Sequence, residues 1–144
     1  YLEKKMDDNE NIYKSQLYQV DVEKHQANGL SFSYAVFSRM SEEGKAKALA
    51  DFGKPPVDIA LASGAMKIVS KICVNQSEYI LPSTTISEAI FRILIANENV
   101  PMSVLDLHSL LAQAWASVIY LKNLSEDVVF KVLEGPNNYG FGRA

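Results

Sequence analysis

The sequence contains few of the residues that build metal sites and disulfides. Among its 144 residues there is one cysteine, Cys73, and there are two histidines, His25 and His108. A single cysteine excludes an internal disulfide, and because Cys73 lies in an apolar run we expect a small buried side chain rather than a reactive thiol. The two histidines are far apart in the chain, so they predict no metal site unless the fold unites them with carboxylates. We therefore expect no cofactor.

Long apolar runs are also missing. The sequence has no stretch of transmembrane length and no signal-peptide pattern, which predicts a soluble, cytoplasmic protein without a membrane partner. Hydrophobic residues make up 48% of the chain and charged residues 22%. This balance is typical of a globular protein and too apolar for a disordered one. The length suits a single domain with its own core.

Motifs for catalysis are scarce. There is no Gly-x-Ser-x-Gly elbow, and the adjacent carboxylates at 42–43 and 126–127 stand at predicted helix starts, where capping roles are more common than acid-base chemistry. We therefore predict that the chain is not an enzyme. The alternative, an enzyme of unknown reaction, would require a deep pocket in which His25 or His108 meets a carboxylate.

Three amphipathic helices are predicted between Thr85 and Leu133. The first carries apolar residues at 86, 89, 90, 93 and 94, the spacing that lines one helical face. Thr85 with Glu88 forms a capping-box pattern, and Ser103 starts the second helix in the same way. The third begins at Ser125 and ends before the stop signal Gly135-Pro136. The stretch between the last two helices, Ala116 to Leu124, is long and apolar for a turn.

These three helices are followed by a tail rich in glycine and aromatic residues, Tyr139-Gly140-Phe141-Gly142. The stretches Ser-Glu-Ala-Ile-Phe-Arg-Ile-Leu, Val-Pro-Met-Ser and Leu-Ser-Glu-Asp-Val-Val-Phe-Lys-Val-Leu carry the pattern. Over roughly the last 60 residues the chain resembles the helix-turn-helix core of a winged-helix domain. The resemblance implies that the tail lies where a wing begins. It also implies that the third helix is the one that DNA-binding members present to the major groove.

The N-terminal half predicts a different arrangement. Residues 1–15 are mostly charged and read as a flexible or frayed arm. Alternating residues on either side of Asn28-Gly29 favour a β-hairpin with strands near 17–23 and 30–37. Helices are predicted at 41–52 and 57–74, and Tyr79 to Leu81 is read as a short strand. The predicted fold class is α+β and mainly helical, with residues 16–74 and 85–144 as two halves that pack as one compact unit.

The charge balance and the aromatic residues of the second half indicate a class of function. From Thr85 to Ala144 there are six acidic residues against four basic ones, a local net charge of −2. We therefore favour a non-catalytic protein-interaction or regulatory module that binds a protein partner or a second copy of the chain. Aromatic residues are enriched at the centres of interfaces. The candidate contacts are Trp115, Tyr120, Tyr139 and Phe141.

The alternative is a DNA-binding transcriptional regulator of the winged-helix type. Its candidate nucleic-acid contacts are Lys122, Lys131 and Arg143. Glu126 and Asp127 count against this alternative, because they occupy the first turn of the third helix, where phosphate would be repelled.

Overall fold

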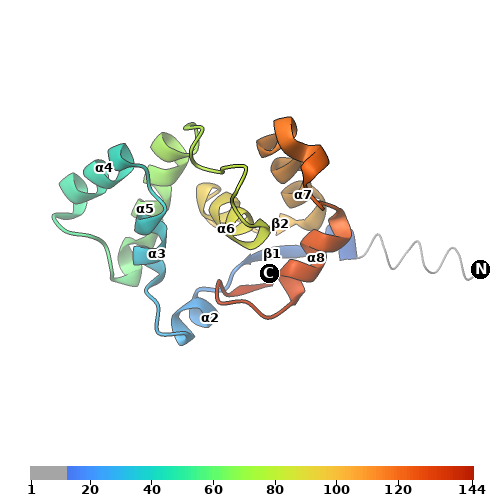
Figure 1. Ribbon diagram of the computed structural model, residues 1–144. Helices are drawn as coiled ribbons and strands as arrows, with labels where there is room; N and C mark the ends of the chain where they lie inside the picture. The colour runs from blue at the N-terminus through green and yellow to red at the C-terminus, as the bar shows by residue number, and fades with distance from the viewer. Residues whose placement is uncertain (1–12) are drawn as a thin grey trace, which may run out of the picture.

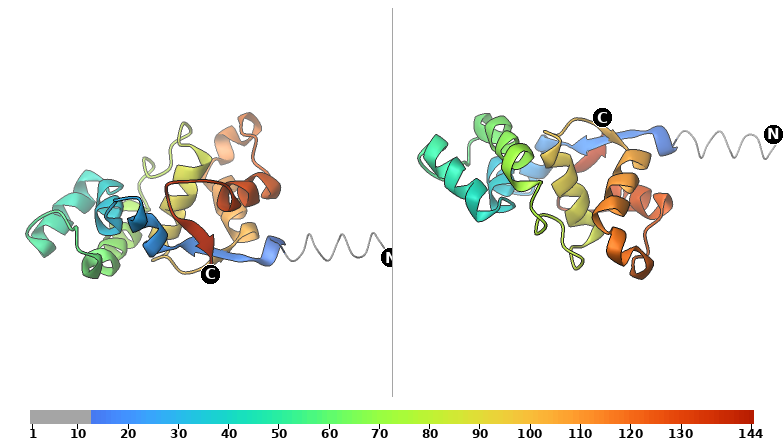
Figure 2. Two further views of the ribbon diagram at one scale, coloured as in Figure 1. Left: turned by 90° about the horizontal axis from the view of Figure 1, so that it is seen from below. Right: turned by 90° about the horizontal axis from the view of Figure 1, so that it is seen from above.

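The computed structural model describes residues 13–144 and shows a mainly helical protein with one small antiparallel sheet (Figure 1). Most of the arm predicted at residues 1–15 lies outside the described residues. Helices α3 (Phe32–Ser38), α4 (Glu42–Phe52) and α5 (Ala62–Ile68) gather at one end of an elongated molecule, and the last two helices lie at the other (Figures 1 and 2). Helix α6 (Ile86–Ala96) stands between them.

The other elements fall into the two halves of the chain. The first half contains β1 (Leu17–Val20), α2 (Val22–Ala27), α3 (Phe32–Ser38), α4 (Glu42–Phe52), the 3-10 turn η1 (Ile59–Leu61), α5 (Ala62–Ile68) and the π-helical turn η2 (Val69–Cys73). The second half adds β2 (Met102–Ser103), α7 (Val104–Ala114), the 3-10 turn η3 (Ala116–Leu121), α8 (Glu126–Glu134) and β3 (Phe141–Arg143) to α6. The three helices predicted in the second half and the helix predicted at 41–52 are confirmed. The helix predicted at 57–74 is α-helical only over α5, with η1 before it and η2 after it.

Side-chain caps explain where these helices begin. Ser41 accepts a hydrogen bond from the backbone N–H of Gly44, Ser103 from that of Asp106 and Ser125 from that of Val128, each at 3.1 Å. Each cap satisfies one backbone donor that a helix start leaves open. Thr85 caps α6 in the same way, at 3.3 Å.

The predicted hairpin is wrong. Only its first strand exists, as β1, and residues 32–38 form helix α3 instead of the second strand. Phe32 and Val36 are four residues apart, so this segment also fits a helix with both on one face. The burial of the side chains distinguishes the helix from the strand. Ala35 is 8% exposed whereas Tyr34 is 48% exposed, the reverse of what a strand requires. Tyr79 to Leu81 is likewise not a strand but part of a turn-rich connector.

Strand β1 is the middle strand of the sheet, whose order is β2-β1-β3. Both neighbours are antiparallel and both come from the second half of the chain. Leu17 pairs with Ser103 on one edge, and Val20 pairs with Phe141 on the other. The sheet therefore ties the two halves together through long-range pairing rather than through a local hairpin.

The turn after α6, which precedes β2 in the chain, continues the edge of the sheet beyond β2. Glu98 and Asn99 adopt left-handed conformations with φ of 56° and 59°. The N–H of Asn99 bonds to the carbonyl of Leu94 at 2.8 Å and that of Glu98 to Ile95 at 3.1 Å, the pattern of a Schellman motif. This turn aims the Asn99 carboxamide at β1, where its Oδ1 accepts from the N–H of Val20 at 2.8 Å and its Nδ2 donates to the carbonyl of Val20 at 2.9 Å.

The core runs without interruption through both halves. Its largest fully buried side chains come from β1, α3, α6, α7 and the residue after α7: Tyr18, Phe32, Ile90, Phe91, Leu94, Ile95, Leu107, Leu111 and Trp115. Cys73 is 1% exposed, so the expectation of a buried cysteine is confirmed. Among the described residues no helix is long and apolar enough to cross a membrane.

The carboxamide of Asn99 provides the first prediction. Asn99→Ala removes two hydrogen bonds and leaves both backbone groups of buried Val20 without partners, so we expect it to lower the free energy of unfolding by about 2–4 kcal/mol. Asn99→Gly should cost a similar amount for the lost bonds but less in total, because glycine adopts positive φ freely. Urea unfolding of the two variants measures the difference. Wild-type stability in Asn99→Ala would contradict this role.

Candidate functional site

The four aromatic residues predicted as partner contacts do not form one surface. Trp115 and Phe141 are 1% and 4% exposed and belong to the core. Tyr139 is half-buried, and its ring lies between those of Phe91 and Phe141 at centroid distances of 5.4 and 5.3 Å. Tyr120, by contrast, is 80% exposed. Of the four, Tyr120 alone projects into solvent.

Tyr120 belongs to an exposed apolar turn that we define as Ile119, Tyr120 and Leu121, in η3. Ile119 is 37% exposed and Leu121 is 70% exposed. Three large apolar side chains in succession with so much exposed surface are unusual, because single exposed hydrophobics are ordinary but contiguous ones mark contact sites. Tyr120 was predicted from its aromatic side chain, whereas Ile119 and Leu121 were missed, although the apolar character of the stretch from Ala116 to Leu124 was a signal for them.

Contacts at both ends hold the apolar turn in place. On its N-terminal side, the indole Nε1–H of buried Trp115 donates to the carbonyl of Leu81 at 2.9 Å. On its C-terminal side, the Lys122 ammonium lies 4.2 Å from the centre of the Trp115 ring and donates to the carbonyl of Pro82. The two anchors fix the ends of η3 against residues 81–82, so the exposed side chains sit on an ordered support.

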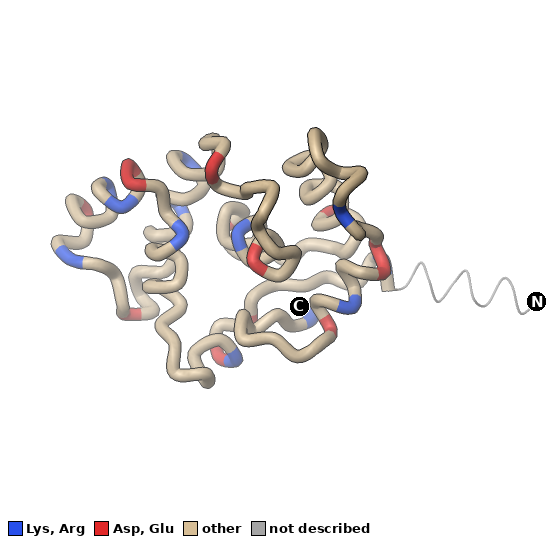
Figure 3. The backbone as a smooth tube through the Cα atoms, viewed as in Figure 1, with Lys and Arg blue, Asp and Glu red and all other residues tan. Residues whose placement is uncertain are grey.

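The three candidate nucleic-acid contacts already have internal partners. Lys122 is held over Trp115, Lys131 pairs with Asp127 at 2.9 Å, and the Arg143 guanidinium pairs with Glu134. The acids of α8 outnumber its bases by three to one, which leaves the helix a net charge of −2. Basic and acidic positions are interspersed along the described backbone (Figure 3).

Neither histidine has a carboxylate partner among the residues that the structure describes. Nδ1 of His25 lies 2.8 Å from the carbonyl oxygen of Tyr139, and the ring is 2% exposed between the phenyl rings of Phe32 and Phe91. His108 is half-buried on α7. Within residues 13–144 no group of three or more His, Cys, Asp or Glu side chains is placed to hold a metal ion.

A charged cluster around Glu88 joins α3, α6 and the C-terminal tail. Its Oε1 accepts from Nη2 of Arg39 at 3.0 Å and from the hydroxyl of Tyr139 at 3.2 Å. Its Oε2 accepts from Nε of Arg39 at 3.0 Å and from Nε of Arg92 at 2.8 Å. Burial acts to raise the pKa of Glu88, but the hydrogen bonds from the two arginines outweigh it and lower the pKa below its usual value.

The Glu88 cluster corrects one sequence prediction. Thr85 does cap α6, but the Glu88 carboxylate binds Arg39, Arg92 and Tyr139 and does not complete a capping box. The sequence offers no signal for this change, because Arg39 is 49 residues away and only the fold brings it near. The cluster is structural, since each of its acceptor oxygens is occupied by a donor of the chain.

Comparison of the chain with protein-family models, with curated proteins and with solved structures gives no match in any of the three.

The Glu88 cluster predicts a pH dependence. Because the pKa of Glu88 is lower in the folded protein than its ordinary value of 4.5, the cluster stabilises the fold above that pH and loses its contribution as pH falls through the folded pKa. Glu88→Gln should therefore lower the free energy of unfolding at pH 7 by about 1.5–3 kcal/mol, with a difference from wild type that shrinks below pH 4.5. Denaturant unfolding at several pH values measures this. The control, Glu23→Gln, removes an exposed carboxylate outside the cluster, and a pH-independent difference for Glu88→Gln would contradict the account.

The start of α8 supplies a test of the DNA-binding alternative. Ser125→Ala removes the cap and should cost about 1 kcal/mol. Neutralising Glu126 and Asp127 to Gln and Asn breaks their pairs with Lys14 and Lys131, and should cost roughly 0.3–1 kcal/mol, less at high salt. We expect both variants, like the wild type, to bind duplex DNA weakly and without sequence preference. Melting curves and DNA titrations check this, and a sharp gain in DNA affinity on neutralisation would show that α8 faces a nucleic acid.

Proposed function

We propose that this chain is a non-catalytic protein-interaction module and that the apolar turn Ile119–Leu121 is its partner-binding element. The observation that carries the proposal is the exposure of Tyr120 and Leu121, 80% and 70%, on a turn whose ends are anchored. The three-helix arrangement of α6, α7 and α8 serves in this proposal as the scaffold that presents the turn.

Two terms favour binding through the apolar turn: the burial of its side chains and the anchoring of the turn before the partner binds. Covering a large apolar side chain contributes roughly 1.5–3 kcal/mol. Tyr120 and Leu121 together would therefore supply the central contact of an interface, and tyrosine is one of the residues that dominate such contacts. Because the indole–carbonyl bond to Leu81 and the Lys122 contact hold the turn before binding, little conformational entropy is lost on association.

The chemistry of the turn defines the partner. The three side chains carry no charge, so the complementary surface is an apolar pocket with an acceptor or donor for the Tyr120 hydroxyl. The acidic character of α8, which follows the turn directly, favours a rim with basic residues on the partner. No observation on the described residues favours the DNA-binding alternative, because Lys122, Lys131 and Arg143 are already paired.

Site-specific photo-crosslinking tests the proposal. A benzophenone amino acid placed at position 120, in the cells that make the protein, should give a covalent adduct of defined mass with one protein. The same probe at Val57, which is 60% exposed but lies in the other half, is the control and should give none. The adduct at position 120 should disappear when Leu121 is replaced by Ser, with an unchanged melting temperature.

The outcomes of this experiment separate the alternatives. An adduct with twice the mass of the chain, together with concentration-dependent mass in sedimentation, would identify a second copy as the partner. The same diffuse adducts at positions 120 and 57 would contradict the proposal, because they would show that the apolar turn has no preferred contact.

A further inference from the structure

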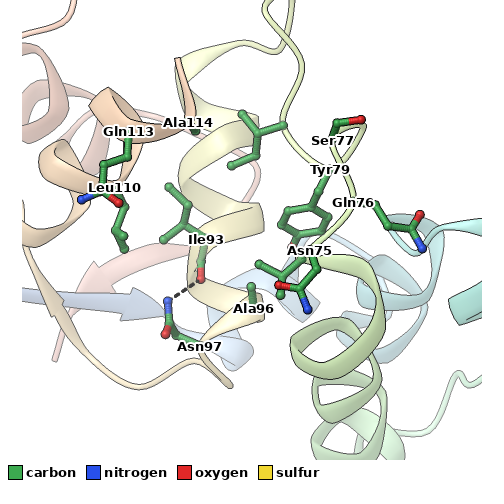
Figure 4. A pocket seen from close by; sticks show the side chains of 12 residues that line it. Asn75, Gln76, Ser77, Tyr79, Ile93, Ala96, Asn97, Leu110, Gln113 and Ala114 are labelled. Carbon is green, nitrogen blue, oxygen red and sulfur yellow. Dashed lines mark hydrogen bonds between the residues drawn. The ribbon is translucent and has the colours of Figure 1, made fainter. Parts of the chain in front are cut away.

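A cavity lies between the connector that follows η2 and helices α6 and α7. It has a volume of about 620 Å³ and opens between α7 and the connector that follows η2, with α6 at its base (Figure 4). Binding sites for small molecules have volumes of about 300–1,000 Å³, so this cavity is of ligand size. Its lining does not include the apolar turn, so a ligand in this cavity would bind apart from the proposed partner-binding element.

The base of the cavity is apolar and its rim is made of carboxamides. Tyr79 and Ile93 are each 6% exposed and contribute to the base together with Leu110. Around the opening stand the side chains of Asn75, Gln76, Asn97 and Gln113. Figure 4 shows Gln113 on one side and Asn75 and Gln76 on the other. No lining residue carries a charge.

Two structural features shape this cavity. Turn η2 is π-helical, with the N–H of Val74 bonded to the carbonyl of Val69 at 3.0 Å, and the lining begins at Val74 where that turn ends. Single π-helical turns are rare and occur often at functional sites. The connector is also held to α6 at Tyr79, whose hydroxyl donates to the carbonyl of Arg92 while Nη1 of Arg92 donates to the carbonyl of Tyr79 at 2.8 Å.

Two of the four rim carboxamides are available to a ligand. Gln76 bonds to Glu43 at 3.3 Å, and Asn97 uses its Nδ2 for the carbonyl of Ile93 at 3.2 Å. The side-chain carboxamides of Asn75 and Gln113 have no hydrogen-bond partner within residues 13–144. Each carboxamide offers a donor beside an acceptor, which matches the edge of an amide or imide. A charged ligand would lose its hydration without finding an opposite charge in the lining.

We propose that this cavity binds a neutral small molecule with a flat apolar body and an amide-like or imide-like edge. The flat body lies over Tyr79, Ile93 and Leu110, and the polar edge meets the carboxamide of Gln113. Because one wall is the connector after η2 and the opposite wall is α7, an occupant would brace the connector against α7.

Three probes of nearly one shape separate this proposal from adventitious binding. Benzamide is neutral, benzoate is its anionic counterpart and benzamidine its cationic one. Titrated into the full chain and followed by backbone and side-chain amide NMR, benzamide should shift residues 74–80 and 110–114 and the side-chain amide of Gln113 in a saturable way. Benzoate and benzamidine should bind about tenfold or more weakly, and toluene, which lacks the polar edge, should also bind more weakly.

Substitutions in the cavity lining test whether benzamide binds there. Ala114 is an exposed helix residue on the lining, so Ala114→Trp should fill the cavity and abolish the benzamide shifts. Ala50→Trp makes the same change at an exposed position of α4 and should leave them intact. Gln113→Leu removes one carboxamide and should weaken benzamide severalfold while leaving toluene unaffected, which keeps the test decisive if Ala114→Trp disturbs folding. Equal shifts from all three charged and neutral probes, or unchanged benzamide binding in both lining variants, would overturn the proposal.

Discussion

The middle position of β1 is the constraint on which the rest of this structure depends. A buried middle strand needs hydrogen-bonding partners along both edges, and here β2 and β3 supply them from the other half of the chain. Val20 lies beyond the reach of β2, and there the carboxamide of Asn99 takes the place of a strand and bonds to both backbone groups of Val20. The end of α6 is therefore shaped by the needs of β1, which explains its two left-handed residues.

The Glu88 cluster joins the same parts of the molecule by a second route. Arg39 comes from the end of α3, Glu88 and Arg92 from α6, and Tyr139 from the tail that leads into β3. A carboxylate with two guanidinium partners is stable below the surface only while all members are present. The sheet and the cluster thus depend on the same tail, and we expect the two halves to unfold as one cooperative unit.

The surfaces that remain have distinct chemistry, and this supports separate proposals for them. The apolar turn is convex, anchored and rich in exposed hydrophobic area, as suits a contact with another protein. The cavity beneath α7 is concave, uncharged and rimmed by carboxamides, as suits a neutral small molecule. Helix α8 carries a net negative charge and its one base, Lys131, is paired with Asp127, which leaves no basic surface for phosphate on that helix.

The sequence by itself determined the local structure of the second half. Apolar spacing and the caps Thr85, Ser103 and Ser125 predicted all three helices, because a cap and a helical face are set by residues within a few positions of each other. The predicted contact Tyr120 is exposed, but no local pattern distinguished it from buried Trp115 and Phe141. Only the tertiary structure decided the partners of β1, the helical state of residues 32–38, the role of Glu88 and the cavity. Each of these depends on contacts between residues far apart in the chain, and burial against such distant neighbours outweighs the weak local preference that alternation expresses.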